Sequence, residues 1–304
     1  MFGVERSEMR YGFSDVSIPP GHSTGELESP SIWRLEISEN PEKHVVLLES
    51  KVLGKEQYFL DIANRIKTSA DSSALVFVHG YNVTFEDAAR RTAQMSYDLR
   101  FGGAPIFFSW PSKGDTALYT HDEATIEWAE TDLKRFLDDV LTRSEAKNVY
   151  IVAHSMGNRA VTRALGTLLA EKRDLRPKVK EIILAAPDID AGTFKSAIAP
   201  ALVGAGRPIT LYASSDDKAL QASRKVHGEA RLGNAGKSLV VMPGVETVDA
   251  TGVDTSFVAH SYYGSIPAVL ADIYHIIHNS LRAYQRASLQ PAGSPTAVYW
   301  MFAK

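Results

Sequence analysis

Short apolar runs alternate along the chain with longer stretches in which apolar residues recur every three or four positions. The apolar runs predict strands at residues 44–50, 74–80, 104–110, 148–154, 179–187, 208–214 and, as the last strand, 238–243. The longer stretches predict helices at 56–66, 85–100, 122–143, from the end of the 148–154 strand to about 172, and at 261–282. Strands separated by helices predict an α/β fold with a mostly parallel, doubly wound sheet and helices on both faces.

The two ends of the chain lack this alternation. Residues 1–43 contain "SIPPGHSTGELESP", rich in Pro, Gly and Ser, and predict an extended N-terminal segment that wraps around the body. Residues 283–304 are expected to form a C-terminal tail in which "QPAGSPTAVYWMFAK" (290–304) opens as a loop and "VYWMF" packs back on the body. Because no repeat or linker interrupts the rest, residues 1–304 are expected to form a single domain.

Composition narrows the class of function. With 44% hydrophobic and 23% charged residues, the 304-residue chain has the composition of a globular protein. A net charge of −3 without a basic patch argues against nucleic acid and anionic membranes as partners. The absence of cysteine excludes disulfides, thiolate metal sites and a cysteine nucleophile. Apolar runs too short to span a bilayer predict a soluble protein, either cytoplasmic or exported after removal of a leader.

One strand-to-helix turn, in "NVYIVAHSMGNRA" (148–160), carries a serine at its corner. Ala153 and Gly157 lie two positions before and after Ser155, where a strained corner requires small side chains. A serine that simply caps the helix would explain Ser155 alone. The pattern small-x-Ser-x-Gly instead favours a nucleophile elbow, in which Ser155 attacks an acyl carbonyl.

A serine of this kind needs two backbone N–H groups to stabilise the oxyanion. The residue after the nucleophile, Met156, provides one. The strand in "ALVFVHGYN" ends at Gly80, which allows a sharp turn that directs the N–H of Tyr81 to the same place. Tyr81 and Met156 are therefore the predicted oxyanion hole, and His154, beside the serine, is a candidate substrate contact.

The general base and its acid should follow the serine in the order acid, then histidine. His260, in "DTSFVAHSYYGS", comes after the last predicted strand and just before the last helix, where such a fold presents its base. Four aspartates at strand ends could orient it: Asp188 and Asp190 after one strand, and Asp216 and Asp217 after the next.

A series of motifs resembles a bacterial family of poorly characterised serine hydrolases with the α/β-hydrolase fold. The motifs are "YG" (11–12), "VSIP" (16–19), His22, "FVHGYN" (77–82), "FSWPS" (108–112), "AHSMGN" (153–158), "APD" (186–188), "LYAS" with "DKAL" (211–220) and "HSYY" (260–263). The resemblance spans almost the whole chain. It implies Ser155 as nucleophile, His260 as base and, from the "DKAL" position, Asp217 as acid.

The implied activity is a carboxylesterase that forms an acyl-enzyme on a small ester, without metal or organic cofactor. The interval 187–208 is too short for the large cap of many lipases, so short acyl esters are expected. Trp110 and Tyr119 are candidate pocket walls, although core packing explains Trp110 equally well. Acyl transfer, thioester hydrolysis or amide hydrolysis would use the same triad, and a non-catalytic binding protein is the alternative from another class. The oligomeric state is left open.

Overall fold

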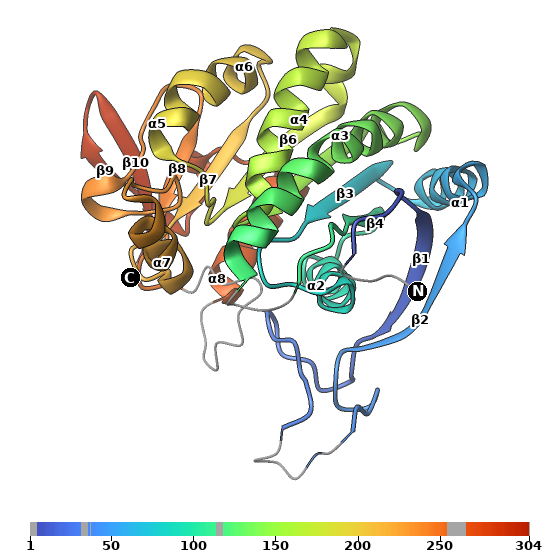
Figure 1. Ribbon diagram of the computed structural model, residues 1–304. Helices are drawn as coiled ribbons and strands as arrows, with labels where there is room; N and C mark the ends of the chain where they lie inside the picture. Colours follow the sequence, from blue (N-terminus) through green and yellow to red (C-terminus); the bar gives the residue numbers. More distant parts are fainter. Residues whose placement is uncertain (1–4, 32–35, 37, 114–117, 254–265, 304) are drawn as a thin grey trace.

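The computed structural model describes residues 5–31, 36, 38–113, 118–253 and 266–303 (Figure 1). Its main sheet has eight strands in the order β4-β3-β5-β6-β7-β8-β10-β9. The strands are β3 (Ser73–Val78), β4 (Ala104–Phe108), β5 (Asn148–His154), β6 (Val179–Ala185), β7 (Ile209–Ala213), β8 (Glu246–Asp249), β9 (Leu289–Ser294) and β10 (Ala297–Phe302). β9 runs antiparallel to β10, and the other neighbouring pairs are parallel.

Helices cover both faces of this sheet. They are α1 (Lys55–Thr68), α2 (Phe85–Asp98), α3 (Tyr119–Arg143), α4 (Gly157–Glu171), α5 (Ala191–Thr193), α6 (Ala199–Gly204), α7 (Lys218–His227) and α8 (Ile266–Asn279), with shorter turns at η3 (Arg173–Lys178), η4 (Phe194–Ile198), η5 (Gly236–Ser238) and η6 (Ala283–Gln285). Side chains alternate along each strand, so Val76 packs toward α1, α3 and α4 while Leu75 and Phe77 pack toward α2 and α8. The predicted α/β fold with a doubly covered sheet is confirmed.

The expected last strand at 238–243 is wrong. Val240 is buried, but Pro243 and Gly244, whose φ is +83°, turn the chain out of an extended path. The strand in this region is β8, further along. It is four residues long with polar ends, and it is held by pairing with β7 on one side and β10 on the other.

The C-terminal residues add a hairpin to the sheet rather than opening as a loop. β9 contains Pro291, which lacks the N–H that an inner strand would need. β9 is the edge strand, so Pro291 is tolerated there. β10 then pairs in parallel with β8, at the end of the sheet far from β4 (Figure 1).

The predicted strand at 44–50 forms outside the main sheet. It corresponds to β2 (Val46–Leu53), which pairs antiparallel with β1 (Tyr11–Ser17) in a separate ribbon. Figure 1 shows this ribbon in blue, beside the β4 end of the sheet. Within the described parts of the chain, no helix is long and apolar enough to cross a membrane.

A buried histidine fastens the N-terminal segment to α2. The His22 side chain is 3% exposed, and its Nδ1 and Nε2 lie 2.9 Å from Glu28 and 3.0 Å from Asp98. The backbone N–H of Gly25 also donates to Asp98, at 2.7 Å. Burial alone would lower the pKa of His22, but the two carboxylates outweigh burial and raise the pKa to about 9.

This histidine should make stability depend on alkaline pH. A folded pKa above the unfolded value of about 6.5 means that the contribution is full below about pH 6.5 and is lost as pH rises through about 9. The pKa difference corresponds to about 3 kcal/mol. Urea unfolding between about pH 6 and pH 10 should show wild type losing its advantage over His22→Gln. A constant difference between the two proteins over this range would contradict the prediction.

Candidate active site

The topology of the sheet brings two turns together. The chain runs from β3 outward to β4, then crosses to β5 on the other side of β3 and continues outward through β6 and β7. Val78 and Ala153 are partners at the ends of β3 and β5, so the turns after these strands are neighbours. Open α/β sheets bind ligands at the carboxyl ends of strands at such a switch point.

The turn after β5 holds Ser155 in a left-handed backbone conformation, with φ of +48°. A serine rarely adopts this conformation, so the surroundings must hold it there. The Ser155 N–H donates to the carbonyl of Ala185, at 3.0 Å. The Ser155 carbonyl accepts from the Asn158 side-chain amide at 2.9 Å and from the Asp188 N–H at 3.1 Å. The strand–turn–helix geometry expected for an elbow is therefore present.

Two glycines allow the turn after β3 to approach this elbow. A Cβ on Gly80 would lie 2.7 Å from the Cβ of Ser155, and a Cβ on Gly157 would lie 2.3 Å from the carbonyl oxygen of His79. Any larger residue at either position would push the turns apart. Tyr81 follows Gly80 directly, and Met156 is the N-cap residue of α4. The structure thus brings together the two turns that carry the predicted oxyanion donors.

His154 lies beneath the Gly80 turn. Its side chain is buried, and burial lowers its pKa to about 3, with nearby Arg91 and His79 acting in the same direction. The imidazole is therefore neutral at neutral pH. The ring packs under the Gly80 turn. A contact between His154 and a substrate stays a prediction.

Trp110 is 1% exposed and belongs to the hydrophobic core. Its indole N–H donates to the His79 carbonyl at 2.9 Å, and its ring stacks on the imidazole of His79 with centroids 5.0 Å apart. Trp110 therefore packs in the core, and its role as a wall of the substrate pocket stays a prediction.

Tyr119, at the start of α3, is half-buried beside the predicted oxyanion turn. Its ring meets the ring of Tyr81 edge-on, with centroids 5.2 Å apart. Its hydroxyl donates to Asp188, is 2.9 Å from the hydroxyl of Ser223, and accepts from Arg159 at 2.9 Å. A candidate wall of the site is therefore held rigidly in place.

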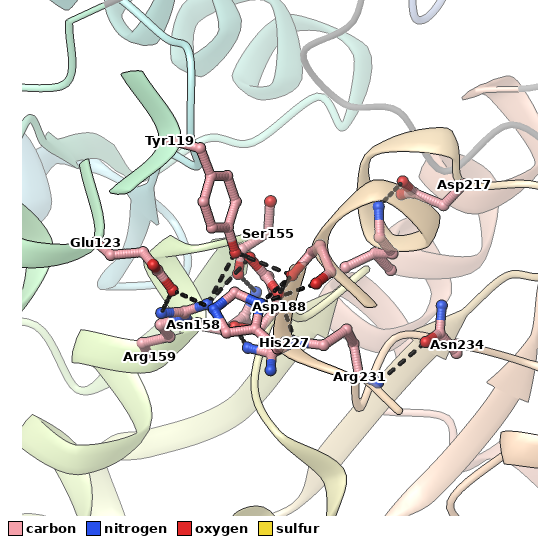
Figure 2. Close-up of polar contacts among 12 residues, drawn as sticks. Tyr119, Glu123, Ser155, Asn158, Arg159, Asp188, Asp217, His227, Arg231 and Asn234 are labelled. Atoms are coloured by element: carbon pink, nitrogen blue, oxygen red, sulfur yellow. Dashed lines mark hydrogen bonds and ion pairs between the residues drawn. The ribbon is translucent and has the colours of Figure 1, made fainter. Parts of the chain in front are cut away.

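Asp188 is the centre of a polar network that sequence patterns did not reveal (Figure 2). Its carboxylate is 2% exposed and accepts from Arg231 Nε and the Ser223 hydroxyl, both at 2.7 Å, and from Tyr119. Burial would raise the pKa of Asp188, but Arg159 and Arg231 outweigh it and lower the pKa. The carboxylate is committed to these partners, which weighs against Asp188 as the acid of a triad.

Two of the other candidate acids, Asp216 and Asp217, lie at the start of α7, and the third, Asp190, lies at the start of α5. Asp217 is the N-cap residue of α7 and accepts from the Leu220 N–H at 2.9 Å. Asp216 accepts from the Gly252 N–H at 2.9 Å and so faces the loop after β8. Asp190 caps α5 through the Thr193 N–H.

The predicted base, His260, lies outside the described residues, as does the rest of "HSYY" (260–263). Among the described residues (5–31, 36, 38–113, 118–253 and 266–303), no group of three or more His, Asp or Glu side chains could hold a metal ion.

The profile of a family described as "Alpha/beta hydrolase of unknown function (DUF900)" matches residues 55–279, more than half of the chain. No curated protein matches.

Similar solved structures share little sequence with this chain. Phospholipase PlaB from Legionella pneumophila is 13% identical, with a TM-score of 0.43 and coverage of 76% of this chain and 69% of that chain. A predicted CIB-like hydrolase from Thermoplasma acidophilum is 14% identical, with a TM-score of 0.40 and coverage of 77% and 93%. Est1E from Butyrivibrio proteoclasticus, solved with ferulic acid bound, is 13% identical, with a TM-score of 0.40 and coverage of 68% and 88%.

Proposed function

Because the chain belongs to the alpha/beta hydrolases of unknown function (DUF900), we propose that it is a serine carboxylesterase that works through an acyl-enzyme. The observation that carries this proposal is Ser155. It has a φ of +48° at the switch point of the sheet, and a Cβ added to Gly80 would lie 2.7 Å from the Cβ of Ser155. A strained serine in one turn, with a second turn beside it and a backbone N–H group available from each, is an arrangement suited to acyl transfer.

In the proposed reaction, His260 takes the proton of the Ser155 hydroxyl as its oxygen attacks the ester carbonyl. The N–H groups of Tyr81 and Met156 stabilise the oxyanion of the tetrahedral intermediate. His260 then protonates the leaving alcohol, and water repeats the cycle to release the acid. Asp217 accepts the second ring N–H of His260 and holds the correct tautomer.

The interval between β6 and β7 supports short acyl chains as substrates. Residues 186–208, all of which are described, contain only the short helical segments α5, η4 and α6. No cap domain stands there to supply a long apolar channel. The rings of Tyr119 and Tyr81, in contact beside the oxyanion turn, support a compact acyl site.

The expected result is hydrolysis of nitrophenyl esters with kcat/KM falling at least about tenfold from short to twelve-carbon acyl chains. Labelling by a fluorophosphonate probe should accompany this activity, because the probe reacts with activated serines. A panel of thioesters and amides with the same short acyl groups identifies the preferred leaving group. A steep rise toward long chains, or activation at a lipid–water interface, would contradict the short-chain preference. Absence of both labelling and turnover would favour a non-catalytic protein.

A further inference from the structure

The segment 108–112, "FSWPS", has no part in the reaction above, yet it packs against the turn that carries Tyr81. The backbone N–H of Trp110 donates to Nε2 of His79 at 3.1 Å, and the indole N–H donates to the His79 carbonyl at 2.9 Å. Two residues on, the Ser112 hydroxyl accepts from the Val83 N–H at 3.3 Å. The turn is therefore fastened at both of its ends to this segment.

These contacts fix the tautomer of His79. Since Nε2 accepts the Trp110 N–H, the proton of the neutral ring is on Nδ1. Nδ1 lies 2.9 Å from the carbonyl oxygen of Gly80, so the Nδ1–H donates to that oxygen. The ring is fully buried, and burial lowers its pKa to about 4, which keeps it neutral at neutral pH.

The bond to Gly80 determines where the next N–H points. The Gly80 carbonyl and the Tyr81 N–H belong to the same peptide group, and the chain has no cis peptide bond among its described residues. In a trans peptide group the C=O and N–H point in opposite directions. Because the His79 ring holds the carbonyl, the Tyr81 N–H points away from that ring.

We propose that His79 is a positioning residue for the oxyanion hole, which uses its Nδ1–H to hold the Gly80–Tyr81 peptide group with the Tyr81 N–H directed at the reacting carbonyl. This inference rests on the proposed function of Ser155. The role of Trp110 is to hold the ring of His79 through the stack and the two hydrogen bonds. A donor misdirected by a flipped peptide would weaken the transition state and leave ester binding nearly unchanged.

Two substitutions distinguish the hydrogen-bonding roles of the two nitrogens of the His79 ring. In His79→Asn the side-chain amide reaches the position of Nδ1, so a donor to the Gly80 carbonyl remains. In His79→Gln the amide reaches the position of Nε2, so only the contact to Trp110 remains. We expect His79→Asn to keep kcat for a short nitrophenyl ester within about fivefold of wild type, and His79→Gln to lower kcat about 100-fold with KM within about twofold.

A thionoester provides a measurement that general loosening of the fold would not change. Sulfur accepts hydrogen bonds weakly, so a C=S substrate gains little from an oxyanion hole. The ratio of kcat for the oxygen ester to kcat for the thionoester should therefore fall about 100-fold in His79→Gln and stay near the wild-type ratio in His79→Asn. Equal ratios in an active wild type and both variants would overturn the inference and leave the proposed function standing.

The tautomer itself can be measured in wild type, with His79→Asn used only to assign the signal. Spectra of ¹⁵N-histidine-labelled wild type should contain a neutral ring protonated at Nδ1 that persists to about pH 5, and His79→Asn should lack it. A ring at this position that is protonated at Nε2 would overturn the inference. A wild type that neither hydrolyses esters nor labels would overturn the proposed function, and the catalytic role of His79 with it.

Discussion

Ser155→Ala is expected to lower kcat for ester hydrolysis by about 10⁵- to 10⁶-fold and to abolish fluorophosphonate labelling. Triad members act as a unit, so removal of the nucleophile alone removes nearly all of their joint contribution. The hydrogen bonds that hold the elbow use the backbone of Ser155 and not its hydroxyl, so alanine should leave the turn in place. Steady-state kinetics and a thermal melt of the same preparation test both statements.

Ser215→Ala is a matched control. This serine is exposed in the turn after β7, and its hydroxyl contacts Thr251. The variant should label and turn over like wild type. An Ser155→Ala protein that retains esterase activity would show that another group performs the attack.

The sequence predicted the inner strands because they are buried on both faces. β3, β5, β6 and β7 are mostly apolar, β6 after a Lys-Glu pair near its start, which is the signal of parallel strands between two layers of helices. β8 was not predicted because this four-residue strand begins and ends with polar residues. Its stability comes from pairing with strands on both sides. β9 was not predicted because Pro291 and Gly293 are typical of loops. A strand tolerates these residues here because β9 lies at the edge of the sheet.

The candidate site, like the sheet, was predictable from the sequence only in part. The elbow at Ser155 and the turn at Gly80 could be predicted because their signals are local, each within a few residues of one strand end. The network around Asp188 could not, because Tyr119, Arg159 and Arg231 come from three separate parts of the chain. Side chains that meet only through the tertiary fold leave no periodic pattern in the sequence.

Trp110 shows how little the sequence alone predicts about the role of a single aromatic residue. An aromatic residue after a strand fits a pocket wall and a core position equally well from the sequence. In the structure the ring of Trp110 is buried and its indole N–H donates to the His79 carbonyl, while a role in the pocket wall stays a prediction. The decisive partner lies 31 residues away in the sequence.

Asp217→Asn is expected to lower kcat by about 10⁴-fold, because a neutral amide favours the wrong tautomer of the base, His260. The substitution should leave the fold nearly unchanged. Asparagine caps helices about as well as aspartate, so the bond from the Leu220 N–H at the start of α7 can be kept. Kinetics and unfolding free energies should therefore show a large catalytic loss with little loss of stability.

Asp188→Asn and Asp216→Asn are the matched controls for this assignment. Asp188→Asn should lower the unfolding free energy by about 3 kcal/mol, because the buried guanidinium of Arg231 loses its charged partner. Its effect on kcat should be far below that of Asp217→Asn. Asp216 faces Gly252, and its replacement should change neither quantity much. If Asp188→Asn instead loses activity at unchanged stability while Asp217→Asn remains active, the acid is Asp188, and the network around it serves the base rather than the fold.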